Sequence, residues 1–231
     1  MKSKNIFFAI AGSLLILNAC KSTAQPANLS VADFETSIAK ASIQLLDVRT
    51  PGEYQSGHLS NALLADWNNP EEFKKRVKAL DKSIPVYTYC LSGARSNAAA
   101  TWLIENGFIA YNLAGGINAW KRAGKAVEMA ETVKQISVDD YLGKIASDKT
   151  VLVDFSAVWC PPCKKMAPVL DSLVASHGSQ FMLVKIDGGQ QTAICTELKV
   201  NGFPTFIIYK KGKEVWRKEG MVDEKEFVQF F

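Results

Sequence analysis

Val151-Leu152-Val153-Asp154-Phe155 is an apolar run, and Trp159-Cys160-Pro161-Pro162-Cys163 follows it just before a helical pattern. A strand that delivers two cysteines to the start of a helix suits dithiol redox chemistry, because the unpaired N–H groups and the helix dipole stabilise a thiolate. Pro161 has no N–H to leave unpaired, and its fixed φ fits the first helical position. A zinc half-site is the alternative, but no second CxxC or CxxH follows to complete four ligands. The stretch therefore indicates a redox-active dithiol in which Cys163 resolves a mixed disulfide on Cys160.

Residues 1–20 have the pattern of a targeting segment. Lys2 and Lys4 precede an apolar core at 6–17, which is shorter than the ~20 residues needed to span a bilayer. The segment ends in Leu17-Asn18-Ala19-Cys20, which resembles a bacterial lipoprotein signal with Cys20 as the lipidated first mature residue. Cleavage by an ordinary signal peptidase is the alternative. Both predict a protein outside the cytoplasm and facing the periplasm. The lipoprotein signal also predicts that only lipid on Cys20 anchors the protein to the membrane, with residues 21–27 as a tether.

The composition excludes several classes of protein. The 231 residues carry a formal net charge of +4, and their basic side chains are scattered rather than clustered, which gives nucleic-acid binding no support. Five cysteines are few for a disulfide-stapled extracytoplasmic protein, so we interpret the thiols as functional groups. We expect no cofactor other than the dithiol itself and no metal.

Strands alternate with helices along the whole chain, which predicts an α/β protein with two domains. The first domain is expected at 28–127, a linker at 128–132 and the second domain at 133–231. In the first domain we predict strands at 43–48 and 85–89, helices at 30–40, 70–80 and 96–106, and a turn at Pro51-Gly52. In the second we predict a β-like piece at 133–136, strands at 150–155, 181–187, 205–209 and 214–217, and helices after Ser137, after Cys160, at 191–198 and from Asp223.

The second domain resembles thioredoxin over essentially all of its length. The resemblance is carried by the apolar run, the Trp-Cys-Pro-Pro-Cys-Lys motif, Pro168 in the following helix and Gly202-Phe203-Pro204-Thr205. It implies that Cys160 is the attacking thiol and Cys163 the buried resolving thiol. It further implies that Trp159, Phe203 and a cis Pro204 contact substrate.

The resemblance also implies that Asp154, buried in its strand, has a raised pKa and relays a proton to or from Cys163. The alternative is that Asp154 is a strand carboxylate whose hydrogen bonds are satisfied. Cys195 is interpreted as a small packed residue, with a third redox thiol as the alternative. Pro168 is expected to kink its helix, and Lys164 and Lys165 to face solvent.

Cys90-Leu91-Ser92-Gly93-Ala94-Arg95 is a second reactive pattern, a lone cysteine after a strand with Gly and Arg before a helix. Loop N–H groups and the helix dipole hold negative charge, and Arg95 adds a cation. Together with Asp47-Val48-Arg49, His58, and Gly115-Gly116, this loop resembles a single rhodanese domain. The resemblance implies a persulfide on Cys90, with residues Leu91, Ser92, Gly93, Ala94 and Arg95 binding the substrate.

The sequence leaves two roles open for Arg95. It could bind substrate, or it could brace the loop through an ion pair with a carboxylate such as that of Asp47. We interpret Asp47, Arg49, Glu53 and His58 as a hydrogen-bonding frame. Phosphatases of the same fold use Cys-x5-Arg, and the Cys-x4-Arg spacing here fits a sulfur atom instead.

Two sulfur sites in one chain favour transfer of sulfane sulfur from Cys90 to Cys160, with small sulfane-sulfur compounds as donors. An oxidoreductase acting on thiol or disulfide proteins of the cell envelope, with the Cys90 domain as a docking or sensing module, is the second hypothesis. A non-catalytic scaffold is the third, and the intact Cys90, Cys160 and Cys163 argue against it.

Overall fold

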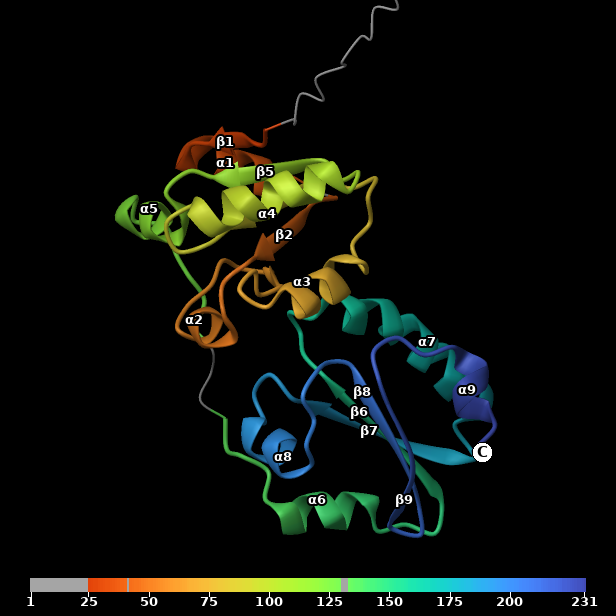
Figure 1. The fold of residues 1–231 in the computed structure, drawn as a ribbon. Helices are drawn as coiled ribbons and strands as arrows, with labels where there is room; N and C mark the ends of the chain where they lie inside the picture. The colour runs from red at the N-terminus through yellow and green to blue at the C-terminus, as the bar shows by residue number, and fades with distance from the viewer. Residues whose placement is uncertain (1–24, 41, 130–132) are drawn as a thin grey trace, which may run out of the picture.

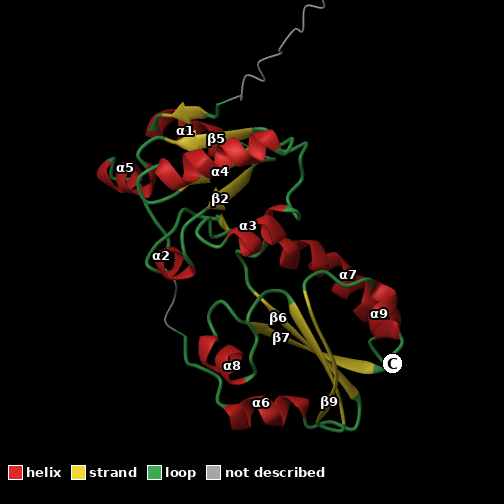
Figure 2. Ribbon diagram, viewed as in Figure 1, coloured by secondary structure: helices red, strands yellow, loops and turns green. Residues whose placement is uncertain are grey.

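The structure is a computed structural model that describes residues 25–40, 42–129 and 133–231, arranged as two lobes joined side by side (Figure 1). Cys20 and the predicted leader lie outside the described residues. Each lobe has its own β-sheet with helices on both faces, as Figure 2 shows. Among the described residues no helix has the length and apolar character required to cross a membrane.

The first lobe holds a fully parallel sheet in the order β1-β5-β4-β2-β3. Its strands are β1 (Ala27–Leu29), β2 (Gln44–Asp47), β3 (Leu63–Leu64), β4 (Val86–Tyr89) and β5 (Ala110–Leu113). Its helices are α1 (Val31–Ile38), α2 (Pro51–Gln55), α3 (Pro70–Val77), α4 (Ala94–Glu105) and α5 (Gly116–Arg122). Because neighbouring residues of a strand face opposite sides, Leu45 packs with α1 and α5 while Leu46 packs with α3 and α4.

The second lobe holds a mixed sheet in the order β7-β6-β8-β9. Its strands are β6 (Thr150–Ser156), β7 (Phe181–Asp187), β8 (Thr205–Lys210) and β9 (Lys213–Glu219). Its helices are α6 (Val138–Ile145), α7 (Pro161–His177), α8 (Thr192–Glu197) and α9 (Glu224–Val228). Leu152 of β6 faces the core under α7 and α9, and Val151 and Val153 face the core under α6 and α8. The predicted α/β class, a parallel-sheet domain followed by a thioredoxin-fold domain, is confirmed.

Three local predictions were wrong. Residues 133–136 form no strand, because Gln191 supplies a side-chain acceptor for the N–H of Ile136 at 2.7 Å in place of a strand partner. Pro51 begins α2 rather than a turn, since Thr50 and Glu53 form a capping box there. Ala27, expected in the tether, is the first residue of β1 and pairs with Tyr111 of β5.

Candidate active site

The dithiol lies where β6 leads into α7. Cys160 is the N-cap residue of α7 and forms a disulfide with Cys163. The Cys160 sulfur also accepts a hydrogen bond from the N–H of Cys163 at 3.2 Å, one of the N–H groups that a helix start leaves unpaired. Pro161 occupies the first helical position, as the sequence predicts. The helix continues through Pro168, with Lys164 and Lys165 exposed.

The disulfide is covered by the first lobe. Cys160 is 0% exposed and Cys163 is 8% exposed, although the sequence predicts an attacking Cys160 and a buried Cys163. Trp159, Cys160 and Cys163 share one apolar cluster with Tyr54, Leu59, Ala62 and Leu64 of the first lobe. The order of accessibility therefore differs from the expectation, and it does so because a neighbouring lobe packs over the start of α7.

Trp159 carries the most specific contacts between the lobes. Its carbonyl accepts a hydrogen bond from the N–H of Leu64 at 2.8 Å. Leu64 lies in β3, an edge strand whose outer N–H groups have no partner within the sheet. The Arg76 guanidinium lies 4.5 Å from the centre of the Trp159 ring, a cation–π contact, and donates to the Leu64 carbonyl at 3.1 Å. These contacts hold the first lobe over the dithiol.

Asp154 lies in the middle of β6 and is 5% exposed. Burial raises the pKa of its carboxyl to about 6, against the opposing effect of a hydrogen bond from the Ser156 hydroxyl at 3.2 Å. Within the described residues its Oδ1 accepts no hydrogen bond. The burial and the raised pKa follow the expectation for a proton-transfer group near Cys163.

Two other predicted residues lie beside Trp159. The Phe203–Pro204 peptide bond is cis, and the Phe203 ring packs edge-on against Trp159 with centroids 5.7 Å apart. Pro204 is buried, and its carbonyl accepts from the N–H of Gly220 at 2.8 Å. Cys195 lies on the buried face of α8, where burial raises the pKa of its thiol to about 11. That environment agrees with a packed residue rather than a reactive thiol.

The second reactive cysteine follows β4 and precedes α4. Cys90 is 1% exposed, and its sulfur accepts a hydrogen bond from the N–H of Gly93 at 3.1 Å. Burial favours the neutral thiol, but the Ser96 hydroxyl and the N–H groups of Ser96, Ser92 and Gly93 outweigh it and lower the pKa of Cys90. Leu91, Ser92 and Ala94 are exposed, while Gly93 is buried. The loop thus stabilises a thiolate at its base.

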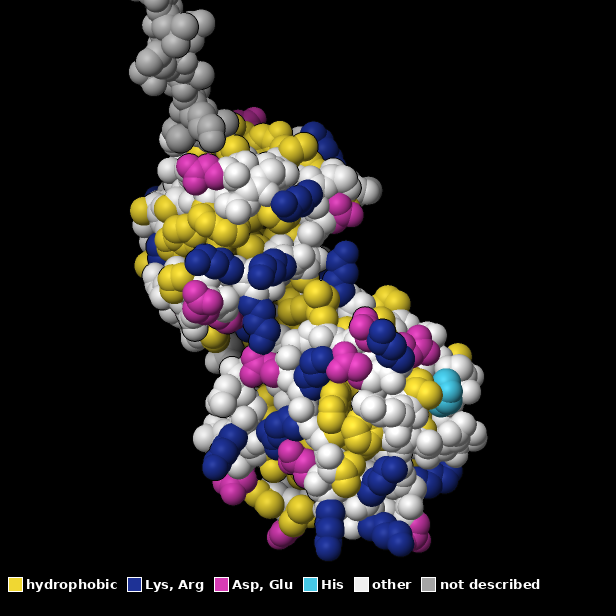
Figure 3. Space-filling model, turned by 45° about the vertical axis from the view of Figure 1, so that its right-hand side comes forward, with side chains coloured by type: hydrophobic (Ala, Val, Ile, Leu, Met, Phe, Trp, Pro, Cys, Tyr) yellow, Lys and Arg dark blue, Asp and Glu magenta, His cyan; other side chains and the backbone are white. Residues whose placement is uncertain are grey.

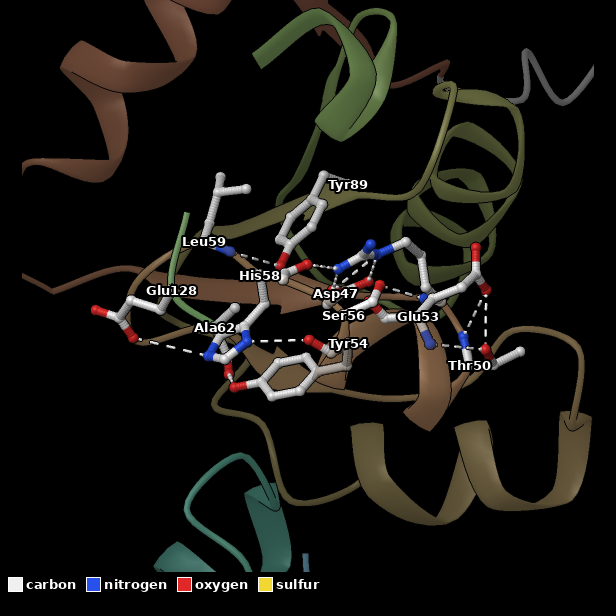
Figure 4. A network of polar contacts seen from close by, with 12 residues as sticks. Asp47, Thr50, Glu53, Tyr54, Ser56, His58, Leu59, Ala62, Tyr89 and Glu128 are labelled. Atoms are coloured by element: carbon white, nitrogen blue, oxygen red, sulfur yellow. Dashed lines mark hydrogen bonds and ion pairs between the residues drawn. The ribbon is translucent and has the colours of Figure 1, made fainter. Parts of the chain in front are cut away.

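Arg95 braces the loop, and its partner is Glu53 rather than Asp47. Its two terminal nitrogens donate to the two carboxylate oxygens of Glu53 at 2.9 and 2.6 Å. This hydrogen-bonded pair holds the pKa of Glu53 at about 2. Asp47 is unavailable because it is bonded by Arg49 within the frame drawn in Figure 4. Arg49 also donates to the Gly57 carbonyl at 2.7 Å, so the predicted frame residues do form a structural network.

The first turn of α5 supports the Cys90 loop through its backbone. The N–H of Ile117 donates to the Cys90 carbonyl at 2.8 Å, and the N–H of Asn118 donates to the Leu91 carbonyl at 3.1 Å. Gly116 allows this close approach, since a Cβ there would lie 2.4 Å from the Cys90 carbonyl oxygen. Its φ of +58° also favours glycine.

Sequence reasoning missed three residues at these sites. Ser96 acts on the Cys90 thiol, and its only signal is that it follows Arg95 in the first turn of α4. Leu64 and Arg76 cover Trp159, and nothing in their local sequence indicates that contact. Among the described residues no group of three His, Cys, Asp or Glu side chains is placed to hold a metal ion.

Comparison with known proteins agrees with both sites. Residues 132–231 match the family model of thioredoxin, and residues 30–123 match that of the rhodanese-like domain. A thioredoxin of Chlamydia muridarum is 38% identical over 97 residues, which are 42% of this chain and 93% of that protein. The chain therefore belongs to the thioredoxin family, and a rhodanese-like domain precedes its thioredoxin domain.

Other relatives match a smaller part of their own length. The chloroplastic thioredoxin Y of Oryza sativa subsp. japonica is 41% identical over 93 residues, and the chain spans only 54% of it, with 40% of this chain covered. Among solved structures, a rhodanese-related protein from Thermoplasma volcanium is 27% identical with a TM-score of 0.41, covering 45% of this chain and 98% of that one. Thioredoxin and rhodanese-like domains together support thiol–disulfide redox chemistry and a sulfurtransferase type of role.

Proposed function

We propose that this protein is a thiol–disulfide oxidoreductase coupled to a rhodanese-type sulfurtransferase, in which the Cys160/Cys163 dithiol reduces a persulfide carried by Cys90. The observation that carries the proposal is that each reactive cysteine lies where a strand leads into a helix, with Cys160 covered by the first lobe. Small sulfane-sulfur compounds are the proposed donors.

The strand register of the first lobe supports a short distance between the two sites. Leu64 of β3, Asp47 of β2 and Tyr89 of β4 lie in one row across neighbouring strands. Two strand spacings separate Tyr89 from Leu64, about 10 Å. Cys90 follows Tyr89, at one end of this row. Leu64, at the other end, donates a hydrogen bond to Trp159, and Cys160 follows Trp159. Because Cys160 is fully covered, transfer requires the lobes to separate at the Trp159 contact.

The proposed cycle balances in two exchanges. The Cys160 thiolate attacks the outer sulfur of the Cys90 persulfide, which forms a persulfide on Cys160 and leaves Cys90 as a thiolate. The Cys163 thiolate then attacks the inner sulfur of that persulfide, closes the Cys160–Cys163 disulfide and releases hydrosulfide. Two electrons pass from the dithiol to the sulfane sulfur, and Asp154 accepts the proton that Cys163 loses. Tethering supports the first exchange with an effective concentration on the order of 1 mM.

A single-turnover experiment tests this coupling. Fully reduced protein is mixed with thiosulfate without added thiol, and the sulfide released per chain is measured. We expect about one sulfide per wild-type chain and almost none from Cys160→Ser, because the latter lacks the accepting thiolate. Cys195→Ala, which removes a packed thiol outside both sites, is the control and should match the wild type. Release from Cys160→Ser at the wild-type rate would refute the coupling.

The coverage of Cys160 supports a second candidate function, in which the rhodanese-like domain is a docking or sensing module for an envelope disulfide reductase or oxidase. Under this alternative, thiol or disulfide proteins of the envelope are the substrates. Insulin reduction that persists in Cys90→Ala, together with no sulfurtransferase activity in the wild type, would favour it.

An extracytoplasmic, periplasm-facing location remains part of the proposal, with the membrane reached through lipid on Cys20. Its support is the sequence pattern of residues 1–20. On the face shown in Figure 3, Lys and Arg side chains are interspersed with Asp and Glu, so that face shows no continuous basic patch. Radioactive palmitate fed to expressing cells should label the wild type but not Cys20→Ala, and an unlabelled wild type would remove the anchor from the proposal.

A further inference from the structure

A pocket of about 400 Å³ opens between the two lobes beside the disulfide. The first lobe contributes Tyr54, His58 and Ala62 to its lining, and Glu128 follows from the segment after α5. The second lobe contributes Asp154, Cys163, Lys164, Ala167 and Lys185. His58 is fixed in this wall, since its ring stacks on Tyr54 with centroids 3.8 Å apart and its Nδ1 lies 3.1 Å from the Tyr54 carbonyl oxygen, as Figure 4 shows.

One cysteine of the disulfide lines the pocket and the other does not. Cys163 lines it and is 8% exposed, whereas Cys160 is outside its lining and 0% exposed. Asp154 lies in the same wall, and its buried Oδ1 accepts no hydrogen bond from any described residue. A buried carboxylate oxygen without a donor is costly unless a proton or a ligand satisfies it. The wall therefore combines a cysteine of the disulfide with an unsatisfied carboxylate oxygen.

The charges around the pocket have both signs. Lys164 and Lys185 contribute ammonium groups, and Glu128 and Asp154 contribute carboxyl groups. A ligand of amino-acid size that carries both an ammonium and a carboxylate group complements this lining. A volume of about 400 Å³ lies within the ~300–1,000 Å³ range of small-molecule sites, so a small ligand rather than a folded protein is the expected occupant.

We propose that this pocket admits a zwitterionic aminothiol of the size of cysteine, which reduces the disulfide by attacking Cys163 while the lobes stay closed. This inference deepens the proposed function, because it supplies the electrons that each turnover of the dithiol consumes.

The exchange balances with two thiols. The first thiolate attacks the Cys163 sulfur, so that a mixed disulfide forms on Cys163, the Cys160–Cys163 bond breaks and Cys160 leaves as a thiolate. A second thiolate attacks the sulfur of the bound aminothiol, which releases the free disulfide and the Cys163 thiolate. The protons of the two thiols end on Cys160 and Cys163, and Asp154 is placed to hand the second one to Cys163. The aminothiol is oxidised and the protein is reduced by two electrons.

The first test compares the two cysteines separately. Cys90→Ala/Cys160→Ser and Cys90→Ala/Cys163→Ser are prepared reduced and mixed with cystine, and cysteinylated peptides are quantified over time by mass spectrometry. We expect Cys163 to react at least tenfold faster than Cys160. The helix dipole favours the thiolate of Cys160 and should by itself make Cys160 react faster with cystine. A faster reaction of Cys163 would therefore reflect its better accessibility to cystine. Equal rates, or a faster Cys160, would overturn the proposal.

The second test blocks the pocket in the Cys90→Ala background, where no sulfur transfer can contribute. Ala167 is exposed on α7 and lines the pocket, so Ala167→Phe should fill it without disturbing the core. Ala175→Phe, also exposed and two turns further along α7, is the matched control. We expect Ala167→Phe to slow reduction of the disulfide by cysteine at least fivefold and Ala175→Phe to leave it unchanged. Equal effects of the two variants would contradict entry through the pocket.

The thiol itself supplies the third comparison. Cysteamine lacks the carboxylate and 3-mercaptopropionate lacks the ammonium group. At equal thiolate concentration, cysteine should reduce the disulfide severalfold faster than either, and equal rates for all three would overturn recognition of the two charges. Because every measurement uses Cys90→Ala, a protein that fails to transfer sulfur from Cys90 can still pass these tests, and the two proposals can fail independently.

Discussion

Asp154 makes the stability of the protein depend on pH. Burial raises the pKa of its carboxyl from an ordinary 3.8 to about 6, so the folded state binds this proton more tightly than the unfolded state does. Its contribution to stability is therefore complete below about pH 4 and is lost as the pH rises through about 6. The carboxyl thus costs stability at neutral pH, in the state in which it can act as a base.

Removing the charge should recover that cost. We expect Asp154→Asn to be about 2 kcal/mol more stable than the wild type at pH 8, with the difference nearly gone at pH 4. Urea unfolding of the oxidised proteins at both pH values measures it. A difference that does not change between pH 4 and pH 8 would mean that Asp154 does not titrate in this window.

Ser96 tunes the other site. Its hydroxyl and N–H are among the groups that lower the pKa of Cys90, so Ser96→Ala should raise that pKa and slow alkylation by iodoacetamide at pH 7 by about threefold to tenfold. The rate is read on the Cys90 peptide of oxidised protein. Thr101→Ala removes another hydroxyl of α4, bonded only to the Asn97 carbonyl, and should leave the rate unchanged. A Ser96→Ala rate equal to that of the wild type would contradict the assignment.

At the scale of elements, the strand-to-helix joins place both cysteines. The β6–α7 join presents the dithiol at a helix start, and the β4–α4 join folds the Cys90 loop around a thiolate. The second join needs support from outside, which the first turn of α5 provides through two backbone hydrogen bonds, donated by Ile117 and Asn118.

Gly116→Ala should damage that support. The added Cβ would meet the backbone of Cys90 and Leu91 at 2.4 to 2.8 Å, and the φ of +58° adds strain. We expect a loss of about 2–4 kcal/mol in unfolding free energy. Gly124→Ala is the control, since Gly124 has a φ of +71° but open space around it, and should cost only about 1 kcal/mol. Chemical denaturation compares the two, and equal losses would show that the close approach to Cys90 adds nothing.

At the scale of the whole molecule, the contact between the lobes controls access to Cys160. Arg76 holds this contact through Trp159 and the Leu64 carbonyl, so Arg76→Ala should shift the closed arrangement toward an open one by about 1–2 kcal/mol. Alkylation of Cys160 in reduced protein should then rise about tenfold, as measured on its peptide by mass spectrometry.

Lys75→Ala is the matched control for Arg76→Ala. Lys75 also bridges the lobes, through an ion pair with Glu219, but both side chains are substantially exposed and such pairs contribute ~0–1 kcal/mol. Its effect on Cys160 labelling should be small. Circular dichroism verifies that α3 is intact in both variants. Unchanged labelling in Arg76→Ala with α3 intact would show that the Trp159 contact does not limit access.

The sequence alone determined the two domains' fold class and the local placement of each reactive cysteine. These depend on nearest neighbours along the chain, because an apolar run, a cysteine and a helix start within a few residues leave few alternatives. The sequence also predicted the burial of Asp154 and a bracing role for Arg95. It did not predict that Arg95 pairs with Glu53 rather than Asp47, because Asp47 is bonded to Arg49 in the folded protein.

Only the tertiary structure decided which cysteine of the dithiol lies beside a pocket. The N–H of Leu64 and the guanidinium of Arg76 meet Trp159 from more than 80 positions away in the chain, at 2.8 Å and 4.5 Å. No local pattern encodes such a contact, because it arises from the packing of one domain's sheet edge on the other domain's helix start. That packing buries Cys160, leaves Cys163 at the edge of a pocket with Asp154, and so sets how the dithiol can be reached.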